Sequence, residues 1–174
     1  MCIRDSCSTS NIEQFIGLAG SLVEQIEAKI IKNKDSSLDA REQHKVLMER
    51  ALDTMRRWDF PHCDAARRLV AFIGQRCIEK SREPNAPLGE GANAFGILQA
   101  EMDRFQETAP ALAPVLHYAL AYNALSLKEN YPCKGKIWCL FELGGIPSMA
   151  HRLPLAKGKF CEGKLADLLG AISE

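Results

Sequence analysis

Apolar residues recur with helical spacing through the first half of this 174-residue chain, and this pattern constrains the fold more than any other feature. Side chains three, four and seven positions apart lie on one face of an α-helix, whereas strand residues alternate with a period of two. The pattern predicts helices over residues 11–32, 40–58 and 64–81. Amphipathic helices must bury their apolar faces, so a helical bundle is expected in the N-terminal part.

Polar residues mark where these helices begin. Ser10 and Glu13 have the spacing of a capping box, in which each side chain accepts a hydrogen bond from the other residue's backbone amide. Asp39 with Glu42 predicts an acidic cap for the second helix, and Asp64 predicts the cap of the third. Each of the three helices therefore has a start signal of its own.

Residues 82–93 interrupt the helical pattern, because they contain two prolines and two glycines. We interpret residues 83–93 as a linker loop between a helical unit over 8–82 and a second unit over 94–174. Within the second unit, helices are predicted over 98–106 and, with Thr108 as the cap, over 109–128.

The apolar spacing changes near the C-terminus. Ile137–Leu143 is a short apolar run rich in strand-forming residues, and it predicts a strand. Gly144-Gly145 predicts a two-residue turn into a second strand over 146–152. Pro147 confines that strand to a sheet edge, because proline has no amide hydrogen. A loop over 153–163 and a last helix over 164–172 complete the prediction.

The predicted fold class is therefore mainly α (α+β), a helical bundle followed by a winged-helix-like segment with a C-terminal β-hairpin. Winged-helix domains place two or three helices before such a hairpin, and they bind proteins as well as nucleic acid. A composition of 47% hydrophobic and 25% charged residues is typical of a globular domain. The apolar runs are shorter than the roughly 18–20 residues that cross a bilayer, so no membrane partner is expected.

The seven cysteines contain no Cys-x-x-Cys pair, so the strongest zinc and redox signatures are missing and no metal site is predicted. Cys77 and Cys139 lie among apolar residues and are predicted to be buried free thiols. This usage favours a reducing, cytoplasmic compartment. One hypothesis is a small enzyme that uses Cys63 or Cys161 with a histidine, which requires a thiol within hydrogen-bond reach of an imidazole.

Local charge is more informative than the total, which is zero and by itself predicts no nucleic-acid partner. Residues 128–164 carry seven Lys and Arg against three Asp and Glu. Flexible lysines beside glycines can approach phosphates closely. The alternative is that these charges solubilise an exposed strand edge and protect it from aggregation. The candidate residues for nucleic-acid or partner binding are Lys134, Lys136, Arg152, Lys157 and Lys159.

Two stretches resemble the C-terminal part of bacterial AAA-type ATPases of the origin-recognition, initiator-like class: residues 10–20, Ser-Asn-Ile-Glu-Gln-Phe-Ile-Gly-Leu-Ala-Gly, and residues 123–155, which include Cys133-Lys134-Gly135 and Leu153-Pro154-Leu155. The resemblance implies a non-catalytic lid and tail whose partner is a missing N-terminal nucleotide-binding domain. It also implies ATP and magnesium for the full-length protein.

The sequence departs from the pattern of these lids at two positions. Glu13 stands where such lids often carry a phosphate-contacting arginine, and Ser10 replaces a glycine. We therefore assign no nucleotide-sensing residue. The Walker A, G-x-S-x-G and H-E-x-x-H motifs are absent from the sequence, so no catalytic residue is predicted.

Residues 1–6, Met-Cys-Ile-Arg-Asp-Ser, read as a translated sequencing adapter and are excluded from fold reasoning. The expectation is then a chain truncated at its N-terminus. A self-contained helical interaction module without an ATPase connection is the alternative. An exposed apolar patch on residues 11–58 would favour the lid, and a closed, patch-free surface there would favour the independent module.

Overall fold

The protein has a mixed α+β fold in the computed structural model, which describes residues 11–33, 35–83, 91–155 and 159–173. No described helix has both the length and the apolar character needed to cross a membrane. The elements run in the order α2 (Ile12–Ile31), α3 (Ala40–Arg56), α4 (Cys63–Ser81), β1 (Ala92–Leu98), α5 (Gln99–Met102), α6 (Phe105–Thr108), a 3₁₀ turn η1 (Pro110–Leu112), α7 (Ala113–Ala121), β2 (Leu125–Cys133), β3 (Lys136–Leu143), α8 (Gly145–Ala150), β4 (Lys159–Glu162) and α9 (Leu165–Ser173).

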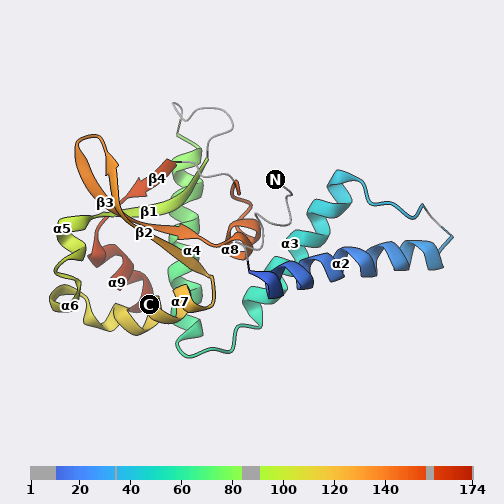
Figure 1. The fold of residues 1–174 in the computed structure, drawn as a ribbon, viewed down its shortest axis with the longest axis horizontal. Coiled ribbons are helices and arrows are strands. Elements are labelled where there is room, and N and C mark those ends of the chain that lie inside the picture. The colour runs from blue at the N-terminus through green and yellow to red at the C-terminus, as the bar shows by residue number, and fades with distance from the viewer. Residues whose placement is uncertain (1–10, 34, 84–90, 156–158, 174) are drawn as a thin grey trace.

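Helices α2 and α3 form an arm that projects to one side of the sheet (Figure 1). Its core joins both helices to α8 and contains Leu18, Leu22, Leu38, Leu47, Ala51, Ile146 and Met149. The acidic cap predicted from Asp39 and Glu42 is confirmed, and it is a capping box, since each side chain accepts the other's backbone amide. Lys29 of α2 then bonds Glu42 at 2.9 Å, which ties the two helices together at their loop end. These contacts make the arm a helical hairpin rather than two independent helices.

The sheet has the strand order β2-β3-β1-β4. Strand β1 pairs antiparallel with β3 and parallel with β4, while β2 and β3 form an antiparallel hairpin. Helix α4 packs on β1, and α7 and α9 pack on α4. The main core lies between these helices and the sheet, and its fully buried members include Leu69, Ile73, Phe95, Phe141 and Leu168. The core of α4 is thus continuous with that of the sheet across the predicted 83–93 linker.

The β-hairpin is present, but the predicted second strand is wrong. Ile137–Leu143 does form a strand, yet its partner is β2, which precedes it. The turn is Lys134-Gly135, with φ of 51° and 72°, because a two-residue turn with both φ values positive matches the twist of the flanking strands. Residues 146–152, predicted as a strand, form α8 and its end, and Pro147 is buried there.

Three predicted boundaries are also corrected. The loop over 82–93 was too long: residues 84–90 lie outside the described part, but Ala92 and Asn93 already belong to β1. The helix over 98–106 is two short helices, α5 and α6. The helix over 109–128 ends at Ala121, because Asn123 adopts a positive φ of 55° and the chain turns into β2.

The remaining corrections concern the C-terminus and the caps. The loop over 153–163 contains β4, whereas the last helix is confirmed as α9. Thr108 caps no helix but ends α6, where its hydroxyl donates to the Arg104 carbonyl. His62, with φ of 62°, precedes α4 in place of Asp64. Asn11 caps α2 by accepting the Gln14 amide at 3.0 Å, and Ser10 lies outside the described residues.

Candidate functional site

The candidate basic residues lie at both ends of the sheet. Lys134 lies in the β2–β3 turn and Lys136 begins β3, whereas Lys159 begins β4 opposite Ala92. Lys159 lies three residues, about 10 Å of strand, from Glu162, which is the residue that Lys134 contacts. Arg152 follows α8 with a positive φ of 57°, and Lys157 lies outside the described residues. The described members of the set therefore come from the β2–β3 hairpin, from the end of α8 and from β4.

The two lysines at the hairpin already have partners within the chain. The ammonium of Lys134 lies 3.7 Å from a carboxylate oxygen of Glu162. That of Lys136 lies 5.9 Å from the centroid of the Trp138 ring, within cation–π range. The Lys134–Glu162 pair is exposed on both sides, so it is weak and can exchange for an external partner.

The cysteines do not form a thiol–imidazole pair in the described part of the chain. Cys63 accepts from the Arg67 guanidinium at 3.7 Å, and Cys161 donates to the Arg76 carbonyl at 3.2 Å. A hydrogen bond with Cys161, together with burial, raises the pKa of the Cys77 thiol. Burial raises the pKa of Cys139 to about 11. The burial predicted for Cys77 and Cys139 is confirmed, and these two thiols stay protonated near neutral pH.

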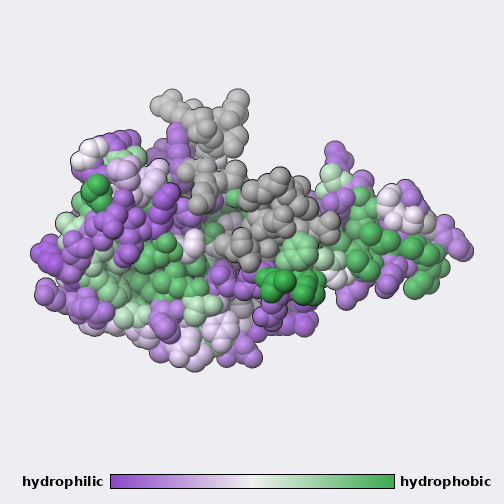
Figure 2. Space-filling view, viewed as in Figure 1, coloured by the Kyte–Doolittle hydropathy of each residue, from purple (hydrophilic) through white to green (hydrophobic). Residues whose placement is uncertain are grey.

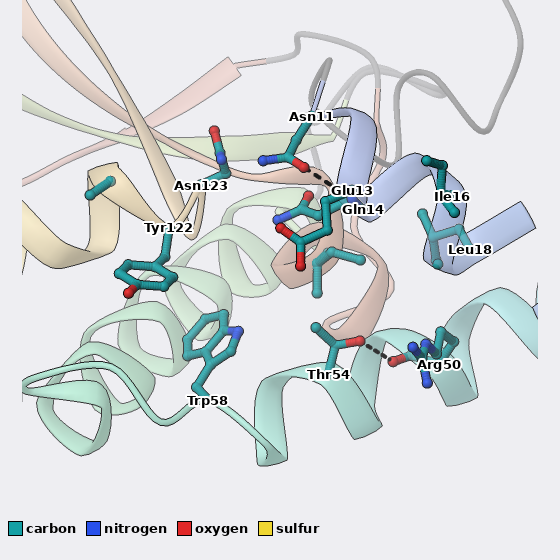
Figure 3. A pocket seen from close by; sticks show the side chains of 13 residues that line it. Asn11, Glu13, Gln14, Ile16, Leu18, Arg50, Thr54, Trp58, Tyr122 and Asn123 are labelled. Carbon is teal, nitrogen blue, oxygen red and sulfur yellow. Dashed lines mark hydrogen bonds between the residues drawn. The ribbon is translucent and has the colours of Figure 1, made fainter. Parts of the chain in front are cut away.

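A cleft of about 570 Å³ lies where the arm meets the rest of the protein (Figure 3). Its walls come from the first turns of α2, the C-terminal half of α3, the end of α7 and the start of α8. The side chains used below are Glu13, Gln14, Arg50, Trp58 and Tyr122. The full lining is Asn11, Glu13, Gln14, Ile16, Gly17, Leu18, Arg50, Thr54, Trp58, Ala121, Tyr122, Asn123 and Ile146.

Hydrogen-bond acceptors gather at one end of this cleft. In Figure 3 the side chains of Glu13 and Gln14 extend from the start of α2 toward the side where Trp58 and Tyr122 lie. The Gln14 carbonyl oxygen is buried and has no hydrogen-bond partner among the described residues. The neighbouring Asn11 carbonyl oxygen already accepts the Gln14 backbone amide. The Gln14 side chain therefore holds a buried acceptor at the cleft whose hydrogen-bonding capacity is unmet.

Aromatic rings form the facing wall. Tyr122 stacks on Phe60 with ring centroids 4.4 Å apart, and Trp58 contacts the same Phe60 at 5.4 Å. Arg67 of α4 fixes this wall, because its guanidinium donates to the backbone carbonyls of Met55, Arg56 and Trp58. Half of the Tyr122 side chain remains exposed. The backbone that leads to Trp58 is thus held by hydrogen bonds, while the Tyr122 side chain remains accessible.

A second feature is an apolar stripe along α2, which we define as Ile12, Ile16, Val23 and Ile30. These side chains are 76%, 63%, 52% and 52% exposed, whereas Leu18 and Leu22 on the inner face are buried against α3. Figure 2 shows apolar side chains gathered along the arm. The last three stripe residues are seven positions apart, so they align along one side of the helix.

Sequence reasoning missed the cleft because its lining comes from four separate segments with no shared spacing. Glu13 was visible only as part of a cap and of the resembling stretch 10–20, Gln14 only as a member of that stretch, and Trp58 only as the end of an apolar helix. The usable signal was the polar pair Tyr122-Asn123 within the apolar segment that was predicted as a helix over 109–128. Comparisons with protein-family models, with curated proteins and with solved structures found no match for this chain.

Proposed function

We propose that the chain is a non-catalytic part of an AAA-type ATPase of the initiator-like class. The α2–α3 arm acts as a lid that packs on a nucleotide-binding domain, and the remainder acts as a protein-binding tail. The observation that carries this proposal is the apolar stripe on α2. The sequence resemblance supports the same assignment, since residues 12–20 of the resembling stretch form the start of α2.

The stripe has the properties of a surface that is covered in a larger assembly. Single exposed apolar residues are common, but four on one side of one helix are characteristic of an interaction site. The inner face of α2 is already satisfied by α3, so the outer stripe contributes nothing to the arm's own core. Covering such side chains contributes about 25 cal/mol per Å² of apolar area removed from water. The stripe would thus hold the lid on the nucleotide-binding domain.

ATP and magnesium would be bound by that other domain. Glu13 lies at the start of α2, where its charge opposes a phosphate group. We therefore assign it no nucleotide contact. The described residues also contain no group of three or more His, Cys, Asp or Glu that could hold a metal ion.

The order of elements supports a winged-helix-like tail. Helix α4 is followed by β1, by the short helices that lead to α7, and by the β2–β3 hairpin, and β1 pairs with β3 in the sheet order β2-β3-β1. A helix placed directly before the wing is the usual reading element of such domains. Here that helix is α7, and the wing tip is Lys134-Gly135.

The composition of α7 favours a protein partner over nucleic acid. Its nine residues, Ala-Pro-Val-Leu-His-Tyr-Ala-Leu-Ala, contain no Lys or Arg, and His117 is its exposed polar side chain. A helix that enters a DNA groove is expected to carry cationic or amide side chains toward phosphates and bases.

The decisive experiment is to read the uncontaminated genomic frame upstream of residue 7. The proposal predicts a Walker A motif followed by an acidic strand-end motif in that frame. A native start codon close to residue 7 would overturn the ATPase assignment and leave a self-contained interaction module.

The stripe can then be tested directly with the upstream domain expressed as a separate polypeptide. The double variant Ile16→Ser, Val23→Ser is expected to lose co-purification with that domain. Leu52→Ser on α3, which also removes an exposed apolar side chain but lies outside the stripe, is the matched control. Equal retention of the domain by both variants would refute the role of the stripe.

The tail is tested by titrating duplex DNA and RNA against salt. Nucleic-acid binding through phosphates weakens steeply as salt rises, with a slope set by the number of contacts. We expect no such binding at physiological salt. Binding that Lys134→Glu with Lys136→Glu abolishes would replace the protein-binding tail by a nucleic-acid-binding one.

A further inference from the structure

We propose that the cleft between α2, α3 and α7 binds the guanidinium group of an arginine side chain from a partner protein. The cleft combines hydrogen-bond acceptors at one end with aromatic rings on the adjacent wall, and a guanidinium uses both. This inference does not depend on the ATPase assignment, because it is argued from the acceptors and rings that line the cleft and not from the family resemblance.

The acceptors determine that the ligand is a donor. The Glu13 carboxylate accepts hydrogen bonds only, and the Gln14 side-chain oxygen is buried without a partner among the described residues. Leaving a buried acceptor unpaired is unfavourable, so a ligand that donates to Gln14 gains more than it would at a hydrated site. A guanidinium carries five N–H donors in one plane, enough to serve both side chains at once.

The aromatic wall determines that the donor is flat. Phe60 covers one face of Tyr122 at a centroid distance of 4.4 Å, and the side chain remains half exposed. Trp58 lies on the same wall and is held by the Arg67 contacts to its backbone. A guanidinium stacks on such rings and is weakly hydrated, whereas a lysine ammonium is compact and strongly hydrated.

The remaining charges are compatible with this ligand. Arg50 lies at the other end of the cleft in Figure 3, and its guanidinium is 3.7 Å from Asp53. The N-terminus of α2 would favour an anion, but Glu13 already supplies the negative charge there. A volume of about 570 Å³ exceeds that of a side chain, so the residues flanking the arginine in the partner can enter as well.

The probe is Nα-acetyl-arginine amide, in which both backbone charges are blocked, titrated into the whole chain. Its citrulline counterpart has the same shape without the charge, and the lysine counterpart has the charge without the plane. The reporters are the two indole N–H signals in nitrogen–proton NMR spectra, since the chain has two tryptophans. We expect the arginine probe to shift the Trp58 signal saturably while that of buried Trp138 stays fixed. The citrulline and lysine probes are expected to bind at least about tenfold more weakly.

Two variants and one matched control assign the contact. Glu13→Gln is expected to weaken the arginine probe about tenfold, the loss typical of one charge-assisted hydrogen bond. Glu24→Gln removes the same charge from the exposed side of α2 outside the cleft, and its affinity should equal that of the native chain. Gln14→Met should weaken binding and leave the melting temperature of the free chain unchanged or higher, because it removes the unpaired acceptor.

Three results would overturn the inference. Equal affinities for the arginine and citrulline probes would exclude charge recognition. Equal losses in Glu13→Gln and Glu24→Gln would reduce the effect to general electrostatics. Tighter binding of free arginine than of the blocked probe would indicate a small-molecule site instead of a protein side chain.

Discussion

Replacing Gly144 with alanine tests the junction between the cleft and the sheet. Gly144 has φ of −61° and ψ of 167°, which any residue adopts, so backbone strain plays no part. A Cβ atom there would lie 2.0 Å from the Asn123 carbonyl oxygen, whereas real Cβ contacts stay beyond 3.0 Å. The two backbone segments must therefore separate by about 1 Å, because neither contact atom belongs to a flexible side chain.

The surrounding hydrogen bonds set the magnitude of this effect. The Gly144 amide donates to the Ala124 carbonyl at 2.9 Å, and the Ala124 amide donates to the Ala119 carbonyl at 2.8 Å. Separation weakens both bonds in addition to the overpacking, so the free energy of unfolding should fall by about 2–4 kcal/mol. This corresponds to a decrease in melting temperature of roughly 5–15 °C for a chain of this size.

The assay is urea denaturation followed by far-ultraviolet circular dichroism. Gly170→Ala in α9 is the matched control, since a Cβ there meets no atom within 4 Å. Alanine is the better helix former, so the control should be more stable by about 0.5–1 kcal/mol. A Gly144→Ala variant within about 0.5 kcal/mol of the native chain would refute the steric argument. The same variant should also weaken the arginine probe, because Asn123 lines the cleft.

Three further predictions follow from other residues. Asp39→Ala removes half of the capping box with Glu42 and should lower the free energy of unfolding by about 1 kcal/mol, and a Ser replacement should restore most of it in urea titrations. Burial lowers the pKa of His151, so the unfolded chain takes up a proton at a higher pH than the folded chain. The contribution of neutral His151 to the free energy of unfolding is therefore fully present above about pH 6.5 and is lost as the pH falls toward the folded-state pKa. A His151→Asn variant should show a smaller drop between pH 7.5 and 5, and an equal drop would contradict this. Iodoacetamide should label partly exposed Cys63 in the folded chain before buried Cys77, and mass spectrometry that finds equal labelling would indicate local opening.

The long helices were predictable because their apolar spacing and their packing agree. Helices α2, α3 and α4 each have an apolar side that the core uses, and Leu47 and Ile73 are buried as the periodicity requires. The strand over Ile137–Leu143 was visible for a similar reason, since an apolar run of this length fits a sheet buried on both faces.

The strands that complete the sheet around β3 were not predictable, because their residues are determined by long-range packing that the spacing of apolar residues does not show. Gly96 in β1 weakens strand propensity, yet the Phe160 ring occupies the place of its missing Cβ, at 2.4 Å from the ideal position. The turn at Lys134-Gly135 lacks the usual Asn-Gly signal, and Gly144-Gly145 offered a stronger but false one. The cleft depends on the arm's position against α7, which no local pattern encodes.

The place of β1 in the sheet has a consequence during synthesis at the ribosome. Both of its partners, β3 and β4, come later in the chain, so β1 leaves the ribosome with neither edge covered. Roughly 45 residues must follow before β3 is complete, which at 5–20 residues per second takes about 2–9 s. During this interval the apolar segment Ala92–Leu98 can pair with a neighbouring nascent chain. The yield of native protein should therefore depend on translation rate and chaperone supply more than the final stability alone would suggest.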